Sequence, residues 1–181
     1  MVLCILAGLS FWLEQAAEVP LQQEPGKPRH EPDTLADTFI LYRHDANGRL
    51  QYKLAAPHME HYPDDDSTRV TRPSLIQFRP DGPQMILEGE TALVTEQGKR
   101  VFVQDNVVVT RTAFGKRKAM KVETTELTIL PEEGIAFNQN PVHISEGSSW
   151  MAGVGLKADN NKGIFQLQSR VRAKYVNPPK E

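Results

Sequence analysis

The sequence predicts an all-β domain, and three observations support this prediction. From residue 34 onward, apolar and polar residues alternate with a period of two in several short segments. No segment in this region has the spacing of apolar side chains that marks an amphipathic helix. Pairs of residues that favour tight turns separate the segments, and they are Asn47-Gly48, Asp81-Gly82, Gln97-Gly98, Glu133-Gly134 and Lys162-Gly163. Many short strands joined in this way are typical of a sandwich, a barrel or a jelly roll.

An apolar segment, residues 1–13, opens the chain and ends where Glu14 begins a polar stretch. A helix of this length reaches about 20 Å, whereas the hydrocarbon core of a bilayer is about 30 Å thick. No Lys or Arg precedes the segment and no A-x-A-like cleavage site follows Leu13, so a membrane anchor and a signal peptide both remain open. We expect an N-terminal transmembrane helix, here in a truncated form.

A proline-rich stretch, residues 14–33, follows the apolar segment. It contains four prolines, several Gln and Glu residues and few apolar side chains. A segment of this composition cannot bury enough apolar surface to fold on its own. We therefore expect an extended tether over residues 14–33, a folded β domain over residues 34–176 and a disordered tail over residues 177–181.

The alternating segments give the order of the expected strands. Residues 50–54 alternate between apolar and polar side chains, and residues 85–93 alternate around Gly89. The clearest alternation is in the last expected strand, residues 165–175. One face of this strand carries Phe165, Leu167, Ser169, Val171, Ala173 and Tyr175, and the opposite face includes Arg170 and Arg172. At a sheet edge this strand would offer unpaired backbone groups to a partner, whereas an interior position would make it purely structural. Both positions remain open.

A weak internal repeat of about 30–35 residues runs through the domain. Glycines precede valines by eight or nine residues in three copies, which are Gly98 with Val107, Gly134 with Val142, and Gly163 with Val171. An earlier copy around Leu75, after Pro73, resembles the copy at Val142. Repeated pairs of strands that stack on their neighbours predict an elongated sheet with open ends.

Composition and motifs exclude several classes of function. The chain has 21 basic and 23 acidic residues, which gives no general electrostatic attraction for nucleic acid. Cys4 is the single cysteine, so neither an internal disulfide nor a multi-cysteine zinc site can form. No phosphate-binding loop, dinucleotide fingerprint or zinc-protease motif occurs. We expect no enzymatic activity, no cofactor and no metal.

Three clusters of polar residues are candidate sites. His58 and His61 lie three residues apart, which on a strand places them on opposite faces, so we interpret them as surface histidines. Residues 64–66 are three consecutive aspartates without the Gly and Glu of a calcium loop, and we interpret them as a solvated loop. The third cluster is a basic stretch that comprises Arg111, Lys116, Arg117, Lys118 and Lys121. This stretch favours a solvated hairpin, with contact to anionic head groups or phosphates as the alternative.

The order of these features resembles the LptC family of lipopolysaccharide export proteins. The resemblance rests on Asp37-Thr38, residues 47–56, Glu60-His61-Tyr62, Pro73, Gly155-Leu156-Lys157 and residues 171–175. It implies a single-pass protein of the cell inner membrane, whose periplasmic domain is an elongated, open β-jelly roll. It also implies that this domain accepts lipopolysaccharide from the ATP-driven transporter LptB, LptF and LptG. The domain would then pass the molecule to the soluble periplasmic protein LptA.

The resemblance assigns roles to individual residues. Lipid contacts fall on Val70, Phe165, Leu167, Val171 and Tyr175. Partner contacts fall on Gly48, Gly155, Arg170 and Arg172. The two glycines also fit turn or bulge geometry, which needs no ligand. The alternative function is a periplasmic β-sandwich that binds carbohydrate or acts as a scaffold, in which the alternating apolar residues only pack a closed core.

Overall fold

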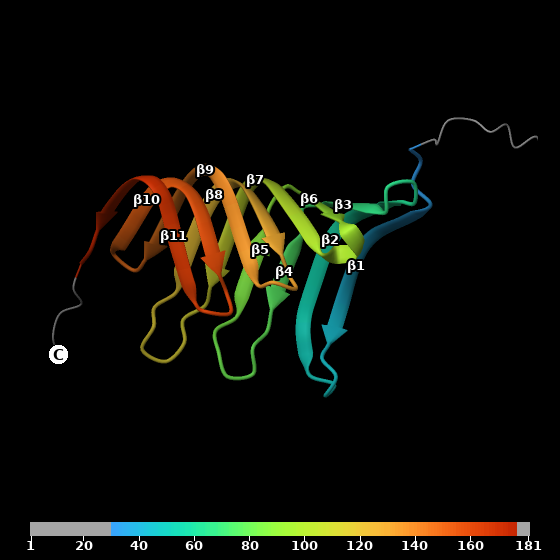
Figure 1. Ribbon diagram of the computed structural model, residues 1–181. Helices are drawn as coiled ribbons and strands as arrows, with labels where there is room; N and C mark the ends of the chain where they lie inside the picture. The colour runs from blue at the N-terminus through green and yellow to red at the C-terminus, as the bar shows by residue number, and fades with distance from the viewer. Residues whose placement is uncertain (1–29, 177–181) are drawn as a thin grey trace, which may run out of the picture.

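The computed structural model describes residues 30–176 and confirms an all-β fold of antiparallel strands (Figure 1). The strands are β1 (Thr34–His44), β2 (Leu50–Tyr62), β3 (Ser67–Thr71), β4 (Ser74–Gln77), β5 (Met85–Glu88), β6 (Thr91–Thr95), β7 (Arg100–Arg111), β8 (Met120–Leu130), β9 (Ile135–Glu146), β10 (Ser149–Asp159) and β11 (Ile164–Lys174). A short 3-10 turn, η1 (Glu96–Gly98), joins β6 to β7.

The expected anchor at residues 1–13, most of the tether at residues 14–33 and the tail at residues 177–181 lie outside the described residues. Within residues 30–176, no helix is both long enough and apolar enough to cross a membrane. The first described strand, β1, begins at Thr34.

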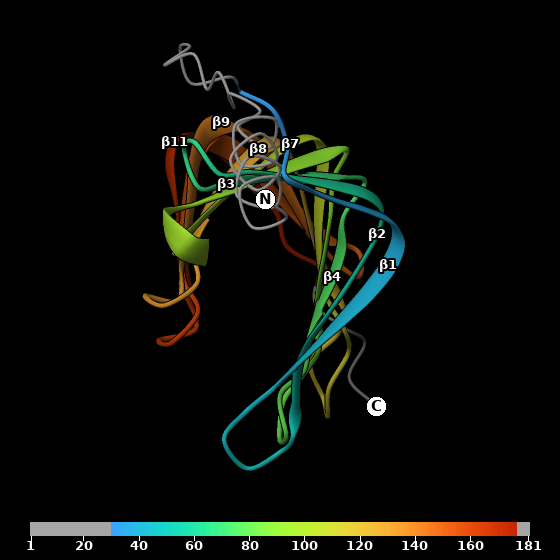
Figure 2. The same cartoon turned by 90° about the vertical axis from the view of Figure 1, so that its right-hand side faces the viewer.

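The sheet is bent into two walls, and the long strands run from one wall into the other. The sheet order is β11-β10-β9-β8-β7-β5-β4-β2-β3-β6, β1 pairs with β2, and β6 also pairs with β7. β2 thus pairs with β3 through one half and with β4 through the other, and β7 divides its length between β6 and β5 in the same way. Seen end-on, the walls form an arch, joined along a spine and open on the opposite side (Figure 2). We call the wall with β3 and β6 wall A, and the wall with β4 and β5 wall B.

The strands bend at the spine, where left-handed backbone conformations occur. Thr38 in β1, Arg72 between β3 and β4, and Asp105 and Asn106 in β7 all have positive φ. Such a conformation costs a residue such as Thr or Arg about 1–2 kcal/mol, whereas Asp and Asn adopt it more readily, so the local sequence disfavours it at Thr38 and Arg72. The packing of the whole sheet therefore imposes the bends.

The bend in β11 is a β-bulge at Arg170, which has a φ of 51°. The pairing shifts between Ala152 and Val154 of β10, so that two residues of β11 lie opposite the single residue between them. The sequence alternates without interruption from residue 165 to residue 175, but the strand is not regular along its length. The difference arises because β11 follows the bend of β10.

The internal repeat corresponds to this bending pattern. The three glycines of the repeat lie in turns at the rim of wall A with positive φ, and they are Gly98, Gly134 and Gly163. The following strand crosses the spine about five to eight residues later. Val107 and Val142 come just after the crossing and are buried, whereas Val171, on the last strand, is 51% exposed. One repeat is therefore one pair of strands, which carries the chain from wall A to wall B and back.

The core lies beneath the spine, between the two walls. Its most buried large side chains are Val103, Val107 and Val70, with exposed fractions of 0%, 1% and 2%. Burial of each such side chain stabilises the fold by roughly 1.5–3 kcal/mol. Leu127 and Ile144 belong to the same cluster, which therefore spans both walls.

Candidate functional site

Continuous rows of apolar side chains line the concave side of the arch. Directly paired residues of neighbouring strands lie on the same face, so the register defines the rows. The row in wall B is Leu41, Leu54, Leu75, Leu87, Val109, Val122, Ile144, Met151 and Ala173. The rows in wall A are Met59, Val70, Ala92, Val103 and Leu127, and Val94, Val101, Ile129, Ala136, Ala158 and Phe165. The floor of the arch consists of the buried members of these rows, which are Val70, Leu87, Ala92, Val103, Val122, Leu127 and Ile144. We call the concave surface that the less buried members of the rows form the groove.

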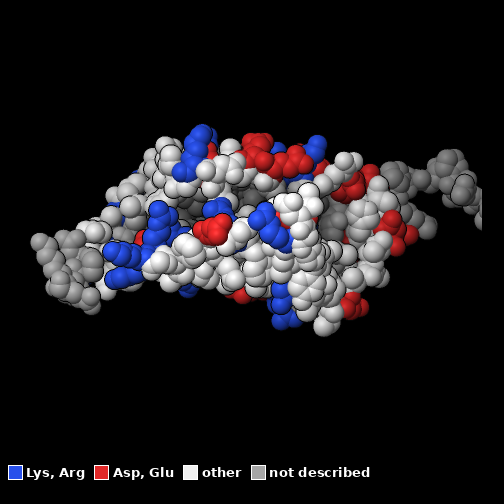
Figure 3. All heavy atoms as spheres, turned by 90° about the horizontal axis from the view of Figure 1, so that it is seen from below, with Lys and Arg blue, Asp and Glu red and all other residues white. Residues whose placement is uncertain are grey.

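The groove opens on the side opposite the spine, where the molecule is hollowed between its walls (Figure 3). At the β11 end it widens into a cavity of about 500 Å³. This volume lies within the range of about 300–1,000 Å³ that is typical of small-molecule sites. Its apolar lining consists of Met120, Ile144, Trp150, Met151, Phe165, Ala173, Tyr175 and Val176. Its charged lining consists of three lysines and one acidic residue, which are Lys116, Lys118, Lys174 and Glu146. The cavity therefore combines an apolar lining with cationic groups.

The five predicted lipid-contact residues do not share one environment. Phe165 and Tyr175 line the cavity and are 40% and 77% exposed, so both have apolar surface available. Leu167 packs against the core, and Val171 is exposed and is one of the two residues of the bulge. Val70 is in the packed core beneath the spine and has almost no exposed surface. Lipid contact at these positions stays a prediction.

The four predicted partner-contact residues lie in three places. Arg172 is on the convex face of β11 and Arg170 is in its bulge. Gly48 is in the turn between β1 and β2 with a φ of 76°, and turn geometry explains this glycine. Gly155 is buried in the bend of β10, where an added Cβ would lie 2.8 Å from Oε1 of Gln168. The backbone accounts for both glycines, and partner contact at all four positions stays a prediction.

Asn138 is a buried polar residue in the bend of β9, and no motif in the sequence marks it. Its Nδ2 donates hydrogen bonds to Oγ1 of Thr124 at 2.7 Å and to the backbone oxygen of Glu126 at 2.8 Å. Its Oδ1 accepts a hydrogen bond of 2.9 Å from the backbone N–H of Leu156. Because its amide is satisfied on both sides, Asn138 can hold β8, β9 and β10 together at the spine.

β1 and β11 are the two edges of the arch. β11 pairs with β10 alone and β1 with β2 alone, so the last strand is an edge strand. Both edges carry exposed apolar side chains, which are Leu35, Ile40, Leu41 and Tyr42 on β1 and Ile164, Phe165 and Val171 on β11. An open edge with exposed apolar side chains favours the addition of a strand from a partner.

The hydrogen bond from Leu156 to Asn138 also determines which backbone groups of β11 point outward. It shows that the N–H of Leu156 faces β9. Backbone groups alternate in direction along a strand, so Lys157 faces β11, and its partner Gln166 faces β10. The N–H groups of Leu167 and Ser169, before the bulge, therefore point away from β10. These groups are the available donors for a partner strand.

Polar side chains fasten β1 to β2 on the convex face. His58 Nδ1 lies 2.6 Å from Oδ1 of Asp37, its direct partner in the register, and His58 Nε2 lies 3.3 Å from Oε1 of Glu60. The hydrogen bond to Asp37, and next that to Glu60, raise the pKa of His58 above its ordinary value. His61 instead contacts Thr68 at 3.1 Å, and it lies on the opposite face, as the spacing predicts.

We expect the interactions of His58 with Asp37 and Glu60 to stabilise the fold less as the pH rises. A histidine whose pKa is raised by folding binds its proton more tightly in the folded state than in the unfolded state. This preference stabilises the fold fully below the unfolded pKa, which is near 6.5 for His58. The stabilisation is lost as the pH rises through the folded pKa. Thermal unfolding at about pH 6 and about pH 8.5 should show a higher midpoint at the lower pH, and His58→Gln should reduce the difference. The control is His44→Gln, at the exposed end of β1. An unchanged difference in His58→Gln would contradict this assignment.

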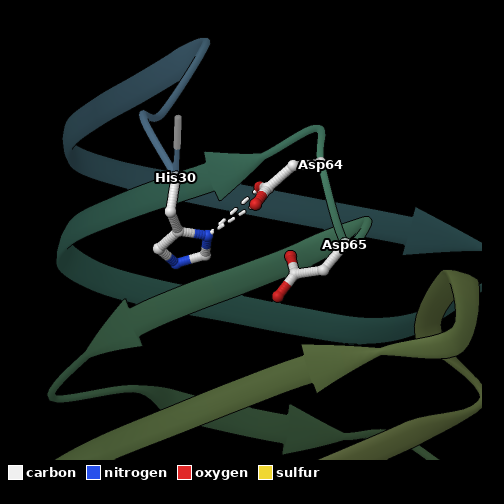
Figure 4. A group of neighbouring side chains, drawn as sticks. All are labelled: His30, Asp64 and Asp65. Carbon is white, nitrogen blue, oxygen red and sulfur yellow. Dashed lines mark hydrogen bonds and ion pairs between the residues drawn. The ribbon is translucent and has the colours of Figure 1, made fainter. Parts of the chain in front are cut away.

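A second polar cluster fastens the chain just before β1 (Figure 4). His30 Nδ1 lies 2.9 Å from Oδ2 of Asp64, and the His30 ring stacks on Tyr62 with a centroid distance of 4.1 Å. This hydrogen bond lowers the pKa of Asp64. Ligand atoms of His30, Asp64 and Asp65 lie within 4.8 Å of one another, but all three residues are exposed. The ion pair and the stacking explain the arrangement, and the aspartates form the exposed turn between β2 and β3.

Comparisons with known proteins relate these features to lipopolysaccharide assembly. A family model described as "Lipopolysaccharide-assembly, LptC-related" matches residues 1–176. No curated protein matches the sequence. The structure is similar to that of LptH from Pseudomonas aeruginosa, described as the LptA-homologous periplasmic component of the lipopolysaccharide transport device. The TM-score is 0.57 at 10% identity, over 70% of this chain and 95% of that chain, so this likeness concerns the fold alone.

Proposed function

Because the chain belongs to the LptC-related family of lipopolysaccharide-assembly proteins, we propose that its groove holds the acyl chains of lipopolysaccharide during transport. A role in lipopolysaccharide transport follows from the family. The observation that supports the groove as the binding site is the continuity of its apolar rows from one edge of the arch to the other. A closed sandwich would bury these rows completely. This arch buries only some of their members and leaves others, such as Val101, Ile129 and Phe165, at least partly exposed, and one side of the arch is open (Figure 2).

The energetics of the acyl chains favour a continuous groove. Exposure of one chain of about 12 methylenes to water costs ~10 kcal/mol, at roughly 0.8 kcal/mol each. A groove with apolar walls along its whole length removes this penalty at every position. Its open side leaves room for the polar sugars outside the walls. Acyl chains can then slide along the groove while they remain buried.

The two open edges support a direction of transfer. The transporter LptB, LptF and LptG would deliver lipopolysaccharide at the β1 edge, and the soluble protein LptA would receive it at the β11 edge. Strand addition at each edge would extend the walls into the neighbouring protein and make one groove from two. The similarity to LptH supports this arrangement, because a partner of the same fold would present walls of the same shape.

The proposed location follows from the same role. The folded domain would lie in the periplasm, and residues 1–13 would hold the protein in the inner membrane as a single-pass anchor. No catalytic step is required, because the transporter supplies the energy from ATP.

A binding experiment separates this function from carbohydrate recognition. We expect the purified protein to bind intact lipopolysaccharide, measured as displacement of a fluorescent lipopolysaccharide at equilibrium. The polysaccharide of the same lipopolysaccharide, released from lipid A by mild acid, should not compete. Competition by the polysaccharide and not by lipid A would contradict acyl-chain binding and would support the carbohydrate-binding alternative.

A further inference from the structure

The basic stretch forms the hairpin that joins β7 to β8, and its members fall into two groups. Arg111 and Lys121, at the base, have ion-pair partners: Arg111 Nη2 lies 3.5 Å from Oε1 of Glu146, and Lys121 Nζ lies 2.6 Å from Oε1 of Glu123. The three cations at residues 116–118 are exposed, and they form no ion pair with any described residue. The tip of the hairpin therefore carries positive charge that the domain does not neutralise.

A second loop, between β4 and β5, lies against this hairpin. The N–H of Thr112 donates to the backbone oxygen of Gln84 at 3.0 Å, and the N–H of Gln84 donates to Oγ1 of Thr112 at 3.0 Å. The two loops enclose a cleft of about 720 Å³, whose charged residues are Arg79, Asp81, Lys116 and Arg117. Arg79 also forms no ion pair among the described residues. The cleft thus has three cations and one acidic residue.

The hairpin itself is held in a defined conformation. Phe114 and Arg117 exchange backbone hydrogen bonds of 3.1 and 3.0 Å. Lys118 extends over the turn between β9 and β10, where an added Cβ on Gly147 would lie 2.9 Å from its Cδ. These contacts fix the backbone conformation at the tip of the hairpin before any ligand binds. The hairpin therefore loses less conformational entropy when a ligand binds.

The cationic cleft adjoins the apolar cavity at the β11 end of the groove. Lys116 lines both the cleft and the cavity, and Lys118 lines the cavity beside Phe165 and Tyr175. On the face seen from below, most Lys and Arg side chains lie toward the β10 and β11 end (Figure 3). Apolar surface and unpaired positive charge therefore meet at one place.

We propose that Arg79, Lys116, Arg117 and Lys118 bind the phosphate groups of the lipopolysaccharide whose acyl chains occupy the adjoining cavity. This inference rests on the proposed function of the groove. A phosphorylated glycolipid carries anionic groups next to its acyl chains, which matches the adjacent cationic cleft and apolar cavity. Guanidinium groups bind phosphate through paired, charge-assisted hydrogen bonds, and lysines add compact charges. The site would hold the head group in a fixed orientation near the exit of the groove.

The test compares two ligands that differ only in their phosphates. The probes are hexa-acylated lipid A with two phosphates and the same lipid A after complete dephosphorylation, and each is bound to the full chain in detergent. We expect the protein to prefer the phosphorylated form by about fivefold to tenfold, as for a few solvent-accessible charged contacts. The triple variant Arg79→Gln/Lys116→Gln/Arg117→Gln should lose this preference and keep its affinity for the dephosphorylated form.

The matched control removes the same charge elsewhere. Arg49, Arg100 and Lys121 are ion-paired outside the cleft, so Arg49→Gln/Arg100→Gln/Lys121→Gln should keep the preference. Equal loss in both triple variants would overturn the site, because net charge alone would explain the preference. Equal binding of both lipids by the unaltered protein would also overturn it and would leave the proposed function intact. Failure to bind either lipid would instead contradict the proposed function.

A contact with the membrane surface is the competing explanation for these cations. Vesicles that contain phosphatidylglycerol test it directly. If the cleft variant loses attachment to the vesicles but keeps its preference for phosphorylated lipid A, the cations serve the membrane and the phosphate site is wrong. If the preference is lost and attachment to the vesicles is unchanged, the phosphate site is supported.

Discussion

A photoreactive residue at position 165 is expected to capture lipopolysaccharide in living cells, whereas the same residue at position 166 should capture almost none. Phe165 lines the apolar cavity, and Gln166 pairs with Lys157 on the convex face of the same strand. Each exposed methylene of an acyl chain costs roughly 0.8 kcal/mol, so a bound chain stays within the groove. The measurement is the amount of lipopolysaccharide attached to the protein after irradiation, detected by immunoblot.

A second pair of positions checks the result after the bulge. Tyr175 lines the cavity, and Arg172 is on the convex face, so capture should be strong at the first and weak at the second. Comparable protein levels and comparable growth of the four strains are the controls. Equal labelling at Phe165 and Gln166 would contradict the assignment of the groove, because these neighbours differ mainly in the face on which they lie.

Ser169→Pro is expected to block transfer to the soluble partner and to leave the fold intact. The N–H of Ser169 points away from β10, so proline removes a donor that only a partner strand would use. The proline ring would also obstruct the approaching strand. Loss of the outward bond and this obstruction should weaken binding to an LptA-type partner by about tenfold or more. Equilibrium binding and thermal unfolding of the purified variant measure the two effects.

The controls for Ser169→Pro distinguish the effect of losing the backbone N–H from the effect of losing the side chain. The hydroxyl of Ser169 lies 3.4 Å from the backbone oxygen of Val154, so Ser169→Ala tests the loss of this weak contact while it keeps the N–H. Gln168→Pro should instead destabilise the domain, because the N–H at residue 168 faces β10. Arg170→Pro is unsuitable, because the φ of 51° at Arg170 is incompatible with proline. Normal partner binding by a folded Ser169→Pro protein would show that β11 is not the docking edge.

The local sequence determines the strands and their turns. For most strand residues it also determines on which face of the strand the side chain lies. Alternation is a property of adjacent residues, so Phe165 and Leu167 could be assigned to one face and Arg172 to the other without a structure. The turn glycines that begin each repeat are equally local, because positive φ at a tight turn favours glycine. The resemblance to the LptC family uses the order of these same features, and the family match confirms it.

Only the tertiary structure determines where the strands bend and what the bends produce. Thr38, Arg72 and Arg170 adopt a backbone conformation that their own sequence disfavours, because the long strands must cross from one wall to the other. For the same reason, no local pattern distinguishes Val70, which is buried in the core, from Phe165, which lines an open cavity. The edge position of β11 also depends on the pairing of all the other strands.

Contacts between residues distant in sequence are also determined only by the tertiary structure. Asn138 reaches Leu156, and Lys116 meets the loop that carries Arg79, although nothing in either local sequence indicates these contacts. The period of two, read from neighbouring residues, therefore determined the strands and their faces. The closing of the walls into an arch decided which of those faces became core, groove or edge, because that outcome depends on long-range pairing.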